Sequence, residues 1–552
     1  MPSSFSYEFN TQVYKSKTTF NTGLFINGKF VDGSDGTTID VVNPTNGQII
    51  TKVSEATSKD VDIAVEAAQK AFDTTWGLNA PGAARSKLLT KLAAAMEACA
   101  DELAALDALD NGKTFGWAQR VDVPFSIELI RYYAGWADKV ALFLSHPRTD
   151  TKEAFVFSPR FTVKFRKQRK INLPTPVTNL SALSVKSYHL STRWNLDLIL
   201  VQVMMMCMKI GPALAAGCTI VLKPSEFTPL SALRMCSIFN EVGFPPGVIN
   251  IVVGYGHTVG AAISSHMKIE KIAFTGSTLT GRKIMEAAAK SNLKNVTLEL
   301  GGKSPNVIFN DADLEQAVNW AFWGIYWNHG QACIAGSRIY VQSGIYDDFL
   351  RLFTEKTKTI KLGDPFAEDT YQGPQVSQIQ YEKIIGYIKS GKEQGATVHY
   401  EGKDNIGEGY FINPTIFTDA KPDMKIMQEE IFGPVCCIIK FEDQDGELPF
   451  YANDTIYGLG AAVFTQNINT ALDVAHKLKA GSVWASFFRI YYIGQRAYFD
   501  AYAIQVNCIN DVNAGVPFGG FKQSGIGREF GEAAIHNYVA VKAVHVNLGI
   551  KM

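Results

Sequence analysis

The sequence KIAFTGSTLTG, residues 271–281, passes from a short apolar run into a turn that contains glycine. An apolar run such as 272–274, bounded by turn residues, is typical of a buried strand. Gly276 and Ser277 follow the run at once, and the alanine-rich stretch after Gly281 predicts a helix. Backbone N–H groups at the start of a helix favour phosphate oxygens, so this turn predicts a phosphate site. Without the preceding strand, the same glycine spacing is more often an ordinary turn.

Strand and helix patterns alternate on both sides of this run. Further strands are predicted at 218–224, 248–253 and 296–300, with a helix at 229–242. Short β-branched runs separated by helices indicate a parallel sheet in a Rossmann-like domain of the α/β class. After residue 301 a second α/β unit follows, with strand runs at 307–309 and 338–341.

The N-terminal part predicts a hairpin and three helices. The sequence FINGKFV, residues 25–31, reads as a hairpin with Asn27 and Gly28 at its turn. From Asp60 the apolar residues recur with a helical period, which predicts one buried face. That face consists of Val61, Ala64, Val65, Ala68, Ala71 and Phe72. Two more helices are predicted at 84–109 and at 125–139.

The composition is that of an ordinary globular protein. The chain has 552 residues, enough for two or three domains, with 46% hydrophobic and 19% charged residues. The formal net charge is zero, which argues against nucleic acid or an anionic membrane as a partner. No run reaches the length of a transmembrane helix. We therefore expect neither nucleic acid nor a membrane among its partners.

The cysteines and residues 1–20 indicate the cellular compartment of the protein. The eight cysteines form neither a C-x-x-C pair nor a Cys/His metal spacing, so we expect reduced thiols and no metal. Residues 1–20 lack the apolar core of a secretory signal, and they carry Glu8 but no arginine. Mitochondrial presequences are rich in arginine and poor in acids. The sequence therefore favours the cytoplasm, with the mitochondrial matrix as the alternative.

A candidate nucleophile stands in GQACIAGSR, residues 330–338, where small and flexible neighbours let other atoms approach the Cys333 sulfur. Upstream, ELGGKSP, residues 299–305, places Glu299 before a glycine pair. A thiol and a carboxylate on such loops are parts of covalent catalysis, with Cys333 as nucleophile and Glu299 as the base that activates water. Taken singly, a cysteine is more often a small buried apolar residue and a glutamate a solvated charge.

Five motifs occur in a fixed order along the chain. They are FTGS (274–277), LELGGKSP (298–305), GQAC (330–333), EEIFGPV (429–435) and PFGGFKQSG (517–525). Together they resemble the NAD(P)-dependent aldehyde dehydrogenase superfamily, and most closely its fungal and animal members that oxidise acetaldehyde and similar aldehydes. The resemblance covers roughly 20–140, 209–484 and 506–552.

The resemblance implies a fold and an assembly. We expect a Rossmann-like, parallel-sheet NAD-binding domain made of 20–140 and 194–300, and an α/β catalytic domain at 301–525. The small oligomerisation element would comprise 141–193 and 526–552. Its C-terminal strand, 538–548, resembles an association strand, so the expected partners are other copies of the chain, as a homodimer or homotetramer, and a small aldehyde substrate.

The resemblance also implies the cofactor residues, which are Lys223, Glu226, Gly276, Ser277, Gly281, Glu430 and Phe432. Lys223 and Glu226 would bind the adenosine ribose hydroxyls, and a carboxylate there repels a 2′-phosphate, so NAD is favoured over NADP. Glu430 and Phe432 would contact the nicotinamide ribose and ring. Judged from the residues alone, Lys223 and Glu226 could equally form a surface ion pair, and Phe432 could pack in a core.

The resemblance implies a covalent mechanism. The Cys333 thiolate would attack the aldehyde, and hydride transfer to NAD would leave a thioester that Glu299 hydrolyses with water. The oxyanion would be held by the Cys333 backbone N–H and an asparagine amide. Asn195 is the only asparagine that follows a tryptophan near the expected place, but its flanks and its spacing to Lys209 differ from the family pattern.

Two segments, 141–208 and 485–505, do not fit the family pattern. The first has a basic middle at 157–170, which could be a nucleic-acid or membrane patch, a solvated loop, or translated non-coding sequence. The second is rich in Phe and Tyr. Our hypothesis is that both are retained introns or gene-model errors.

Other functions stay open on the sequence alone. The two odd segments favour a catalytically impaired family member that serves as a binding or structural protein. An acyl-CoA- or phosphate-dependent dehydrogenase would also form a thioester, but Glu299 favours hydrolysis. The aromatic residues Trp323, Tyr326 and Trp327 suggest an apolar tunnel to the nucleophile or, equally, the core of a helix.

Overall fold

Seven strands form the largest sheet, in the order β16-β17-β18-β15-β14-β19-β20. The computed structural model describes residues 3–140, 142–144, 156–157, 183–189, 202–404, 407–442, 448–486, 509–510 and 512–546. The strands are β14 (Pro305–Ile308), β15 (Arg338–Gln342), β16 (Thr397–Glu401), β17 (Thr415–Thr418), β18 (Val435–Phe441), β19 (Gly460–Phe464) and β20 (Ser482–Ser486). All pairings are parallel except that of the edge strand β16 with β17.

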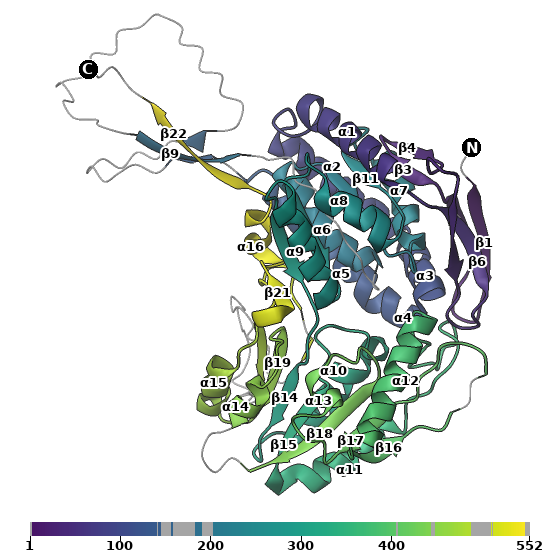
Figure 1. Cartoon of the computed structure of the whole chain (residues 1–552), viewed down its shortest axis with the longest axis vertical. Helices are drawn as coiled ribbons and strands as arrows, with labels where there is room; N and C mark the ends of the chain where they lie inside the picture. Colours follow the sequence, from purple (N-terminus) through teal and green to yellow (C-terminus); the bar gives the residue numbers. More distant parts are fainter. Residues whose placement is uncertain are drawn as a thin grey trace, which may run out of the picture.

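Helices cover both faces of this sheet, which forms the lower body in Figure 1. They are α10 (Leu314–Tyr326), α11 (Tyr346–Thr357), α12 (Gln378–Glu393), α13 (Lys425–Gln428), α14 (Leu448–Asn453) and α15 (Ile468–Lys477). Successive strand residues point to opposite faces, so Cys436 packs with α10 and α11 while Cys437 packs with α12. The adjacent cysteines are therefore both free thiols in separate cores.

The upper body holds two parallel strand pairs. β10 (Ile220–Leu222) pairs with β11 (Ile249–Ile251), and β12 (Lys271–Thr275) pairs with β13 (Asn295–Glu299). The predicted hairpin is confirmed as β3 (Leu24–Ile26) and β4 (Lys29–Val31), and it adds to the β11 edge. Among the described residues, β10 and β12 belong to separate sheets. The parallel pairs are therefore as predicted.

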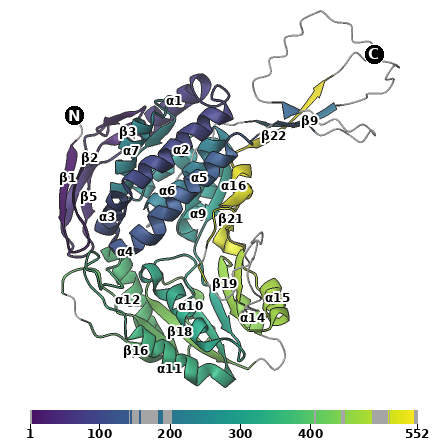
Figure 2. The ribbon, with the colours of Figure 1, turned by 180° about the vertical axis from the view of Figure 1, so that it is seen from behind.

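Ten α-helices in the described part of the chain accompany these strands: α1 (Ser58–Thr74), α2 (Gly82–Ala98), α3 (Ala100–Asn111), α4 (Phe115–Trp117), α5 (Val123–Trp136), α6 (Gln202–Ala216), α7 (Leu230–Val242), α8 (Ala261–Ser265), α9 (Thr278–Lys290) and α16 (Gly531–His536). Helices α2, α3 and α5 lie together on one side of the upper body (Figure 2). The α1 face is buried as predicted, except that Phe72 is only partly buried. Thr57 and Asp60 form a capping box that begins the helix.

Three helix boundaries differ from the prediction. The single helix at 84–109 is two helices, because the backbone leaves helical geometry at Cys99. The alanine and leucine pattern runs through the break, so periodicity gives no sign of it. The helix predicted after Gly281 begins earlier, at Thr278, because the Ser277 side chain accepts the Thr280 N–H and caps it. The third predicted helix ends at Trp136 rather than 139.

An arm of antiparallel strands projects from the upper body (Figures 1 and 2). β22 (Ala540–Val546) pairs along its whole length with β9 (Leu183–His189), and β9 pairs with β7 (Leu142–Leu144), which pairs with β8 (Val156–Phe157). The predicted C-terminal strand is confirmed as β22. None of the helices in the described part of the chain is long and apolar enough to cross a membrane.

Candidate active site

One cavity of about 940 Å³ gathers residues from both bodies. Its walls come from the residues that follow β10, β12 and β13, from α6, α10 and α12, and from the segment after residue 509. The predicted site residues Glu226, Gly276, Ser277, Cys333, Glu430 and Phe432 line it. The cavity therefore brings the predicted nucleophile and most of the predicted cofactor residues together.

The other predicted residues lie directly behind this lining. Glu299 is the last residue of β13 and only 3% exposed. Lys223 follows β10, and its Nζ is 2.9 Å from the Glu226 carboxylate. Gly281 lies in the first turn of α9, where an added Cβ would come within 2.8 Å of the Leu300 side chain. Leu300 itself lines the cavity, so a side chain at 281 would push the cavity wall.

The loop that carries the nucleophile has an unusual backbone. After α10, the turn η3 (Trp327–Gly330) places Asn328, His329 and Gly330 at φ values of 51°, 60° and 71°. The left-handed region disfavours residues that have a Cβ, so Asn328 and His329 are strained unless other contacts hold them. At Gly330 an added Cβ would lie 2.1 Å from the Gly433 carbonyl oxygen, so only glycine fits.

Hydrogen bonds hold this strained loop against the segment 373–376. His329 is buried; its Nε2 accepts the Gly373 N–H at 3.1 Å, so Nδ1 carries the proton and donates to the Pro374 carbonyl at 3.0 Å. The Gln331 side chain accepts the Val376 N–H at 3.0 Å. Burial lowers the pKa of His329 to about 3, so its imidazole is neutral at physiological pH. The loop is therefore fixed by neutral hydrogen bonds that do not depend on charge.

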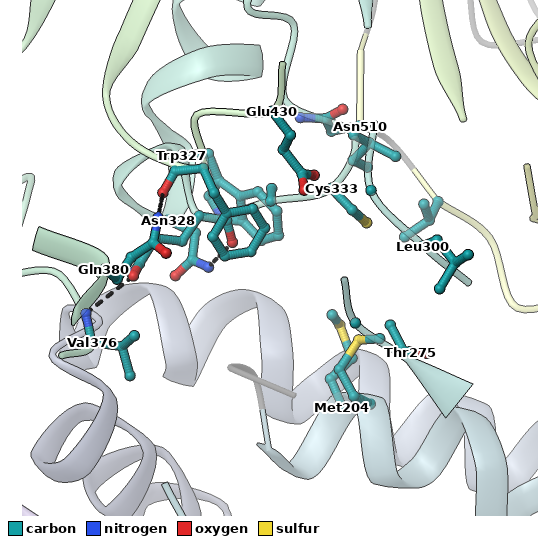
Figure 3. A pocket seen from close by; sticks show the side chains of 18 of the residues that line it. Met204, Thr275, Leu300, Trp327, Asn328, Cys333, Val376, Gln380, Glu430 and Asn510 are labelled. Atoms are coloured by element: carbon teal, nitrogen blue, oxygen red, sulfur yellow. Dashed lines mark hydrogen bonds between the residues drawn. The ribbon is translucent and has the colours of Figure 1, made fainter. Parts of the chain in front are cut away.

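The Cys333 thiol is half-buried and faces the open cavity. Figure 3 shows its sulfur near Glu430, with Met204 on the opposite side of the space. Burial, and then the carboxylates of Glu430 and Glu299, raise the pKa of Cys333 to about 12. The thiol is thus the resting form near neutral pH, and a neighbouring base has to take its proton when it reacts.

Glu430 is held beside the glycine pair that follows Glu299. Its carboxylate accepts the Gly302 N–H at 3.0 Å, and an added Cβ at Gly301 would lie 2.5 Å from that carboxylate. Burial raises the pKa of Glu430 to about 7. A side chain at Gly301 would therefore displace this carboxylate.

Glu299 is the second buried acid at the site. Its Oε2 has no hydrogen-bond partner among the described residues, and an added Cβ at Gly519 would lie 2.7 Å from its Oε1. Burial, and then the nearby Glu529 carboxylate, raise the pKa of Glu299 well above its ordinary range, while Lys209 opposes the rise. Glu529 and Lys209 form a buried ion pair at 2.6 Å. A buried carboxyl group with a raised pKa is a candidate acid or base in catalysis.

The residues present fit a dinucleotide. The N-terminus of α9 follows Thr275 and Gly276 at the cavity wall, so its free N–H groups can bind phosphate oxygens. The Thr275 hydroxyl is buried without a partner among the described residues. Glu226 lies at the same wall with Lys223 as its ion-pair partner, and such a carboxylate can accept from ribose hydroxyls.

Several features were not predicted. Lys209 and Glu529 are 320 positions apart in the sequence, and no local sequence pattern predicts that they pair. His329 also gave no signal, because its role depends on the remote segment 373–376. Asn195, the predicted amide donor, lies outside the described residues. Tyr326 does not line the cavity but is buried in a core beside Cys436, whereas Trp323 and Trp327 do line it.

Comparisons with known proteins agree with one another. The model of the aldehyde dehydrogenase family matches residues 30–159, 194–499 and 489–544. An aldehyde dehydrogenase of Agaricus bisporus is 58% identical over 552 residues, which are 100% of each chain. An aldehyde dehydrogenase 1A1 of Gallus gallus is 44% identical, over 96% of this chain and 94% of that one. The solved NAD+ complex of an aldehyde dehydrogenase from Bacillus cereus has 41% identity and a TM-score of 0.84, over 96% and 97% of the two chains.

Proposed function

This chain belongs to the aldehyde dehydrogenase family, and from that premise we propose that it oxidises its aldehyde through a thioester on Cys333, with NAD as the hydride acceptor. The enzyme is an NAD(P)-dependent aldehyde dehydrogenase; the mechanism and the choice of NAD are the proposal. One observation carries it: Cys333 lines the same cavity as Glu226 and the start of α9, with Glu299 directly behind.

The first step forms a C–S bond. The Cys333 sulfur adds to the carbonyl carbon, the C=O π bond breaks, and the thiol proton passes to Glu299. Transfer in the same step is required because the raised pKa of Cys333 leaves little thiolate at rest. The Cys333 backbone N–H donates to the oxygen that gains negative charge.

The second step depends on the cofactor that Glu226, Ser277, Glu430 and Phe432 would hold. The chemistry that NAD supplies when bound is acceptance of a hydride from the substrate carbon. The carbon that remains on Cys333 is then a thioester. Glu299 first releases the thiol proton to solvent and then takes a proton from water, while the water oxygen bonds to the carbonyl carbon and the C–S bond breaks. The sulfur regains a proton and the product is the carboxylic acid.

The test of the mechanism separates the two half-reactions. We expect NADH formation from acetaldehyde and NAD by the full chain, and none by Cys333→Ala. The variant Glu299→Gln should form NADH more slowly in a single turnover, because it lacks the base that takes the thiol proton, and should then stop, because water is not activated and the acyl group stays on sulfur. Intact-mass measurement would then find one acyl group per chain on Cys333. Steady turnover by Glu299→Gln at the parent rate would rule out this mechanism.

We propose NAD rather than NADP because Glu226 lies where the adenosine ribose would bind. A carboxylate there accepts from the 2′-hydroxyl and repels a 2′-phosphate. The measurement is the ratio of kcat/KM for NAD to that for NADP, in the parent and in Glu226→Gln. The ratio should exceed one in the parent and fall in the variant. A ratio that the substitution leaves unchanged would assign the preference to other residues.

We also propose that the chain assembles as a homodimer or homotetramer through the arm of β7, β8, β9 and β22. The arm supports this because it projects from the body, and among the described strands its outer members β22 and β8 each pair on one side only, which leaves an edge that another copy could pair with. Light scattering after size-exclusion chromatography measures the mass. A monomer at micromolar concentration would contradict the proposal.

The domain limits and the location are further proposals. We keep 20–140 with 194–300 as the NAD-binding domain, 301–525 as the catalytic domain, and 141–193 with 526–552 as the oligomerisation element. Limited proteolysis with and without NAD tests these limits. We place the enzyme in the cytoplasm, with the mitochondrial matrix as the alternative, and a fluorescent fusion at the C-terminus distinguishes the two.

The family model leaves residues 160–193 unmatched. This supports our proposal that segment 141–208 contains translated intron or wrongly framed sequence, and we extend the proposal to 485–505. Sequencing the spliced transcript and tryptic peptides is the test. Finding both segments in the mature protein would overturn it.

A further inference from the structure

The substrate side of the cavity has one wall of tryptophans. Gln316, Trp320 and Trp323 of α10 line the cavity, and so does Trp327, the residue that directly follows the helix. The spacing of the three helical residues places them on one helix face. At about 1.5 Å per residue the wall from Gln316 to Trp327 extends for about 16 Å, from the nucleophile loop outward. The wall is therefore much longer than a two-carbon aldehyde.

The tryptophan wall is held rigidly from behind. The Trp323 ring packs edge-on against Trp117 at 4.8 Å between ring centroids, and it lies 5.8 Å from the Trp327 ring. The Lys113 ammonium lies over Trp327 at 5.4 Å. Because neighbours fix both rings, the wall presents a surface of set shape.

A second part of the cavity lining is made of methionines. Met204, Met205 and Met208 of α6 line the cavity, and Met204 lies across the space from Cys333 in Figure 3. Methionine is flexible and its sulfur makes favourable contacts with aromatic rings. A cavity lined by both rigid aromatic rings and adaptable thioethers suits a flat apolar ring.

The charges around the cavity argue for a neutral tail. The charged side chains that line it are Glu226, Lys383 and Glu430, which lie on the proposed cofactor side. Among the described lining residues, the carboxylates are Glu226 and Glu430, and neither belongs to α10 or α6. A cationic tail would lose its water without gaining a counter-ion, and Trp327 already carries the Lys113 ammonium on its ring.

From these walls we propose that the preferred substrates are neutral aryl aldehydes, whose ring lies between Trp323 and Met204 while the carbonyl reaches Cys333. The inference rests on the proposed function, because it places the aldehyde carbon at Cys333. Burying a ring of phenyl size should raise kcat/KM by about ten- to a hundredfold over acetaldehyde.

The test is a substrate series with NAD: acetaldehyde, hexanal, benzaldehyde, 3-phenylpropenal, and the pair trimethylammonio-acetaldehyde and 3,3-dimethylbutanal. We expect the aryl aldehydes to have the highest kcat/KM, through a lower KM, and the neutral member of the pair to exceed the cationic one. An acetaldehyde value equal to the aryl values, or preference for the cationic member, would overturn the proposal.

Variants locate the effect. In Trp323→Ala, and separately in Met204→Ala, the ratio of kcat/KM for 3-phenylpropenal to that for acetaldehyde should fall about tenfold. If Trp323 or Met204 has only a structural role, its replacement would lower both kcat/KM values and leave their ratio unchanged. That result would contradict the proposed slot, the space between these two side chains that would hold the ring. The matched control is Trp136→Ala on α5, a half-buried tryptophan that does not line the cavity and should keep the parent ratio.

A binding measurement separates this proposal from the proposed function. Calorimetry with 3-phenylpropenamide, which cannot be oxidised, should detect binding with a negative heat-capacity change, weakened about tenfold by Trp323→Ala. Binding of the amide without any aldehyde oxidation would support the slot and contradict the proposed chemistry. Oxidation of aldehydes without binding of the amide would support the chemistry and overturn the slot.

Discussion

At the scale of single residues, charge next to Cys333 governs its reactivity. The Glu430 carboxylate stands second only to burial among the causes that raise the pKa of Cys333 to about 12. Glu430 has an elevated pKa of about 7, so its charge changes near neutral pH. The thiol therefore responds to a group that itself titrates under physiological conditions.

Replacing Glu430 by Gln removes this charge and keeps an oxygen that can accept the Gly302 N–H. We expect the pKa of Cys333 to fall, because its thiolate no longer faces a carboxylate. At pH 8 iodoacetamide should therefore alkylate Cys333 about three- to tenfold faster in cofactor-free enzyme. The measurement is the alkylation rate of the peptide that contains Cys333, as a function of pH.

The control for this experiment is the adjacent residue. Glu429 accepts from the Tyr387 hydroxyl at 2.7 Å and does not contribute to the pKa of Cys333. The variant Glu429→Gln should alkylate at the parent rate. The same acceleration in both variants would mean that the loop had opened, and the electrostatic explanation would fail.

His329 predicts a dependence of stability on pH. Its folded pKa of about 3 lies below the ordinary value near 6.5, so between these values the unfolded chain binds a proton that the folded chain excludes. Stability is fully present above about pH 6.5 and falls as the pH drops toward 3, by about 1.4 kcal/mol per pH unit. In His329→Gln that contribution should vanish, so urea unfolding between pH 6 and 4 should show a shallower slope. Equal slopes would contradict the prediction.

At the scale of elements, the nucleophile loop depends on close backbone contacts with its neighbours. An added Cβ at Gly302 would lie 2.1 Å from the carbonyl oxygen of Cys333. Nothing flexible lies at that point, so the backbone itself would have to move. A small side chain at 302 therefore displaces the reacting sulfur.

For Gly302→Ala we expect kcat to fall by about a hundredfold or more, because a shift of the nucleophile of about 1 Å has that effect. Circular dichroism should show that the fold remains. The control is Gly386→Ala in α12, where an added Cβ meets nothing within 4 Å. That control should keep activity and gain about 1 kcal/mol of stability, since alanine favours a helix over glycine. An active Gly302→Ala would mean that the loop adjusts without cost.

Sequence patterns predicted elements better than their junctions. Runs such as 271–274 and the hairpin turn at Asn27 carry local signals, and each was found as predicted. The break at Cys99 lies inside a continuous alanine and leucine pattern, so only tertiary packing reveals it. Cys333 was predicted from its neighbours and from the order of the motifs. His329, which holds the loop before Cys333, and Glu529, which lies near Glu299, were not predicted. Each acts through contacts with residues that are remote in the chain.

At the scale of the whole molecule, one buried ion pair joins distant parts of the chain. Lys209 of α6 and Glu529 of the C-terminal segment are 1% and 3% exposed. Breaking a buried pair leaves one uncompensated charge, which costs far more than the loss of a surface pair. The pair therefore makes the upper body depend on the last part of the chain.

Lys209→Met should lower the free energy of unfolding by about 3–5 kcal/mol, measured by urea denaturation, because Glu529 stays buried without its cation. The double variant Lys209→Met/Glu529→Leu should recover most of the loss. The surface pair of Lys290 and Glu286, 75% and 61% exposed, supplies the control. Lys290→Met should change stability by less than about 1 kcal/mol. Equal effects at the two sites would show that the buried pair has no special role.

The same ion pair sets an order of events during synthesis on the ribosome. Lys209 is made 320 residues before Glu529, and at about 5–20 residues per second this interval is about 15–60 s. Throughout this interval Glu529 is not yet available to Lys209, and β9 lacks the strand β22 that pairs along its whole length. A nascent chain in that state exposes a template for aggregation, so the demand for chaperones should peak just before the last codons are read.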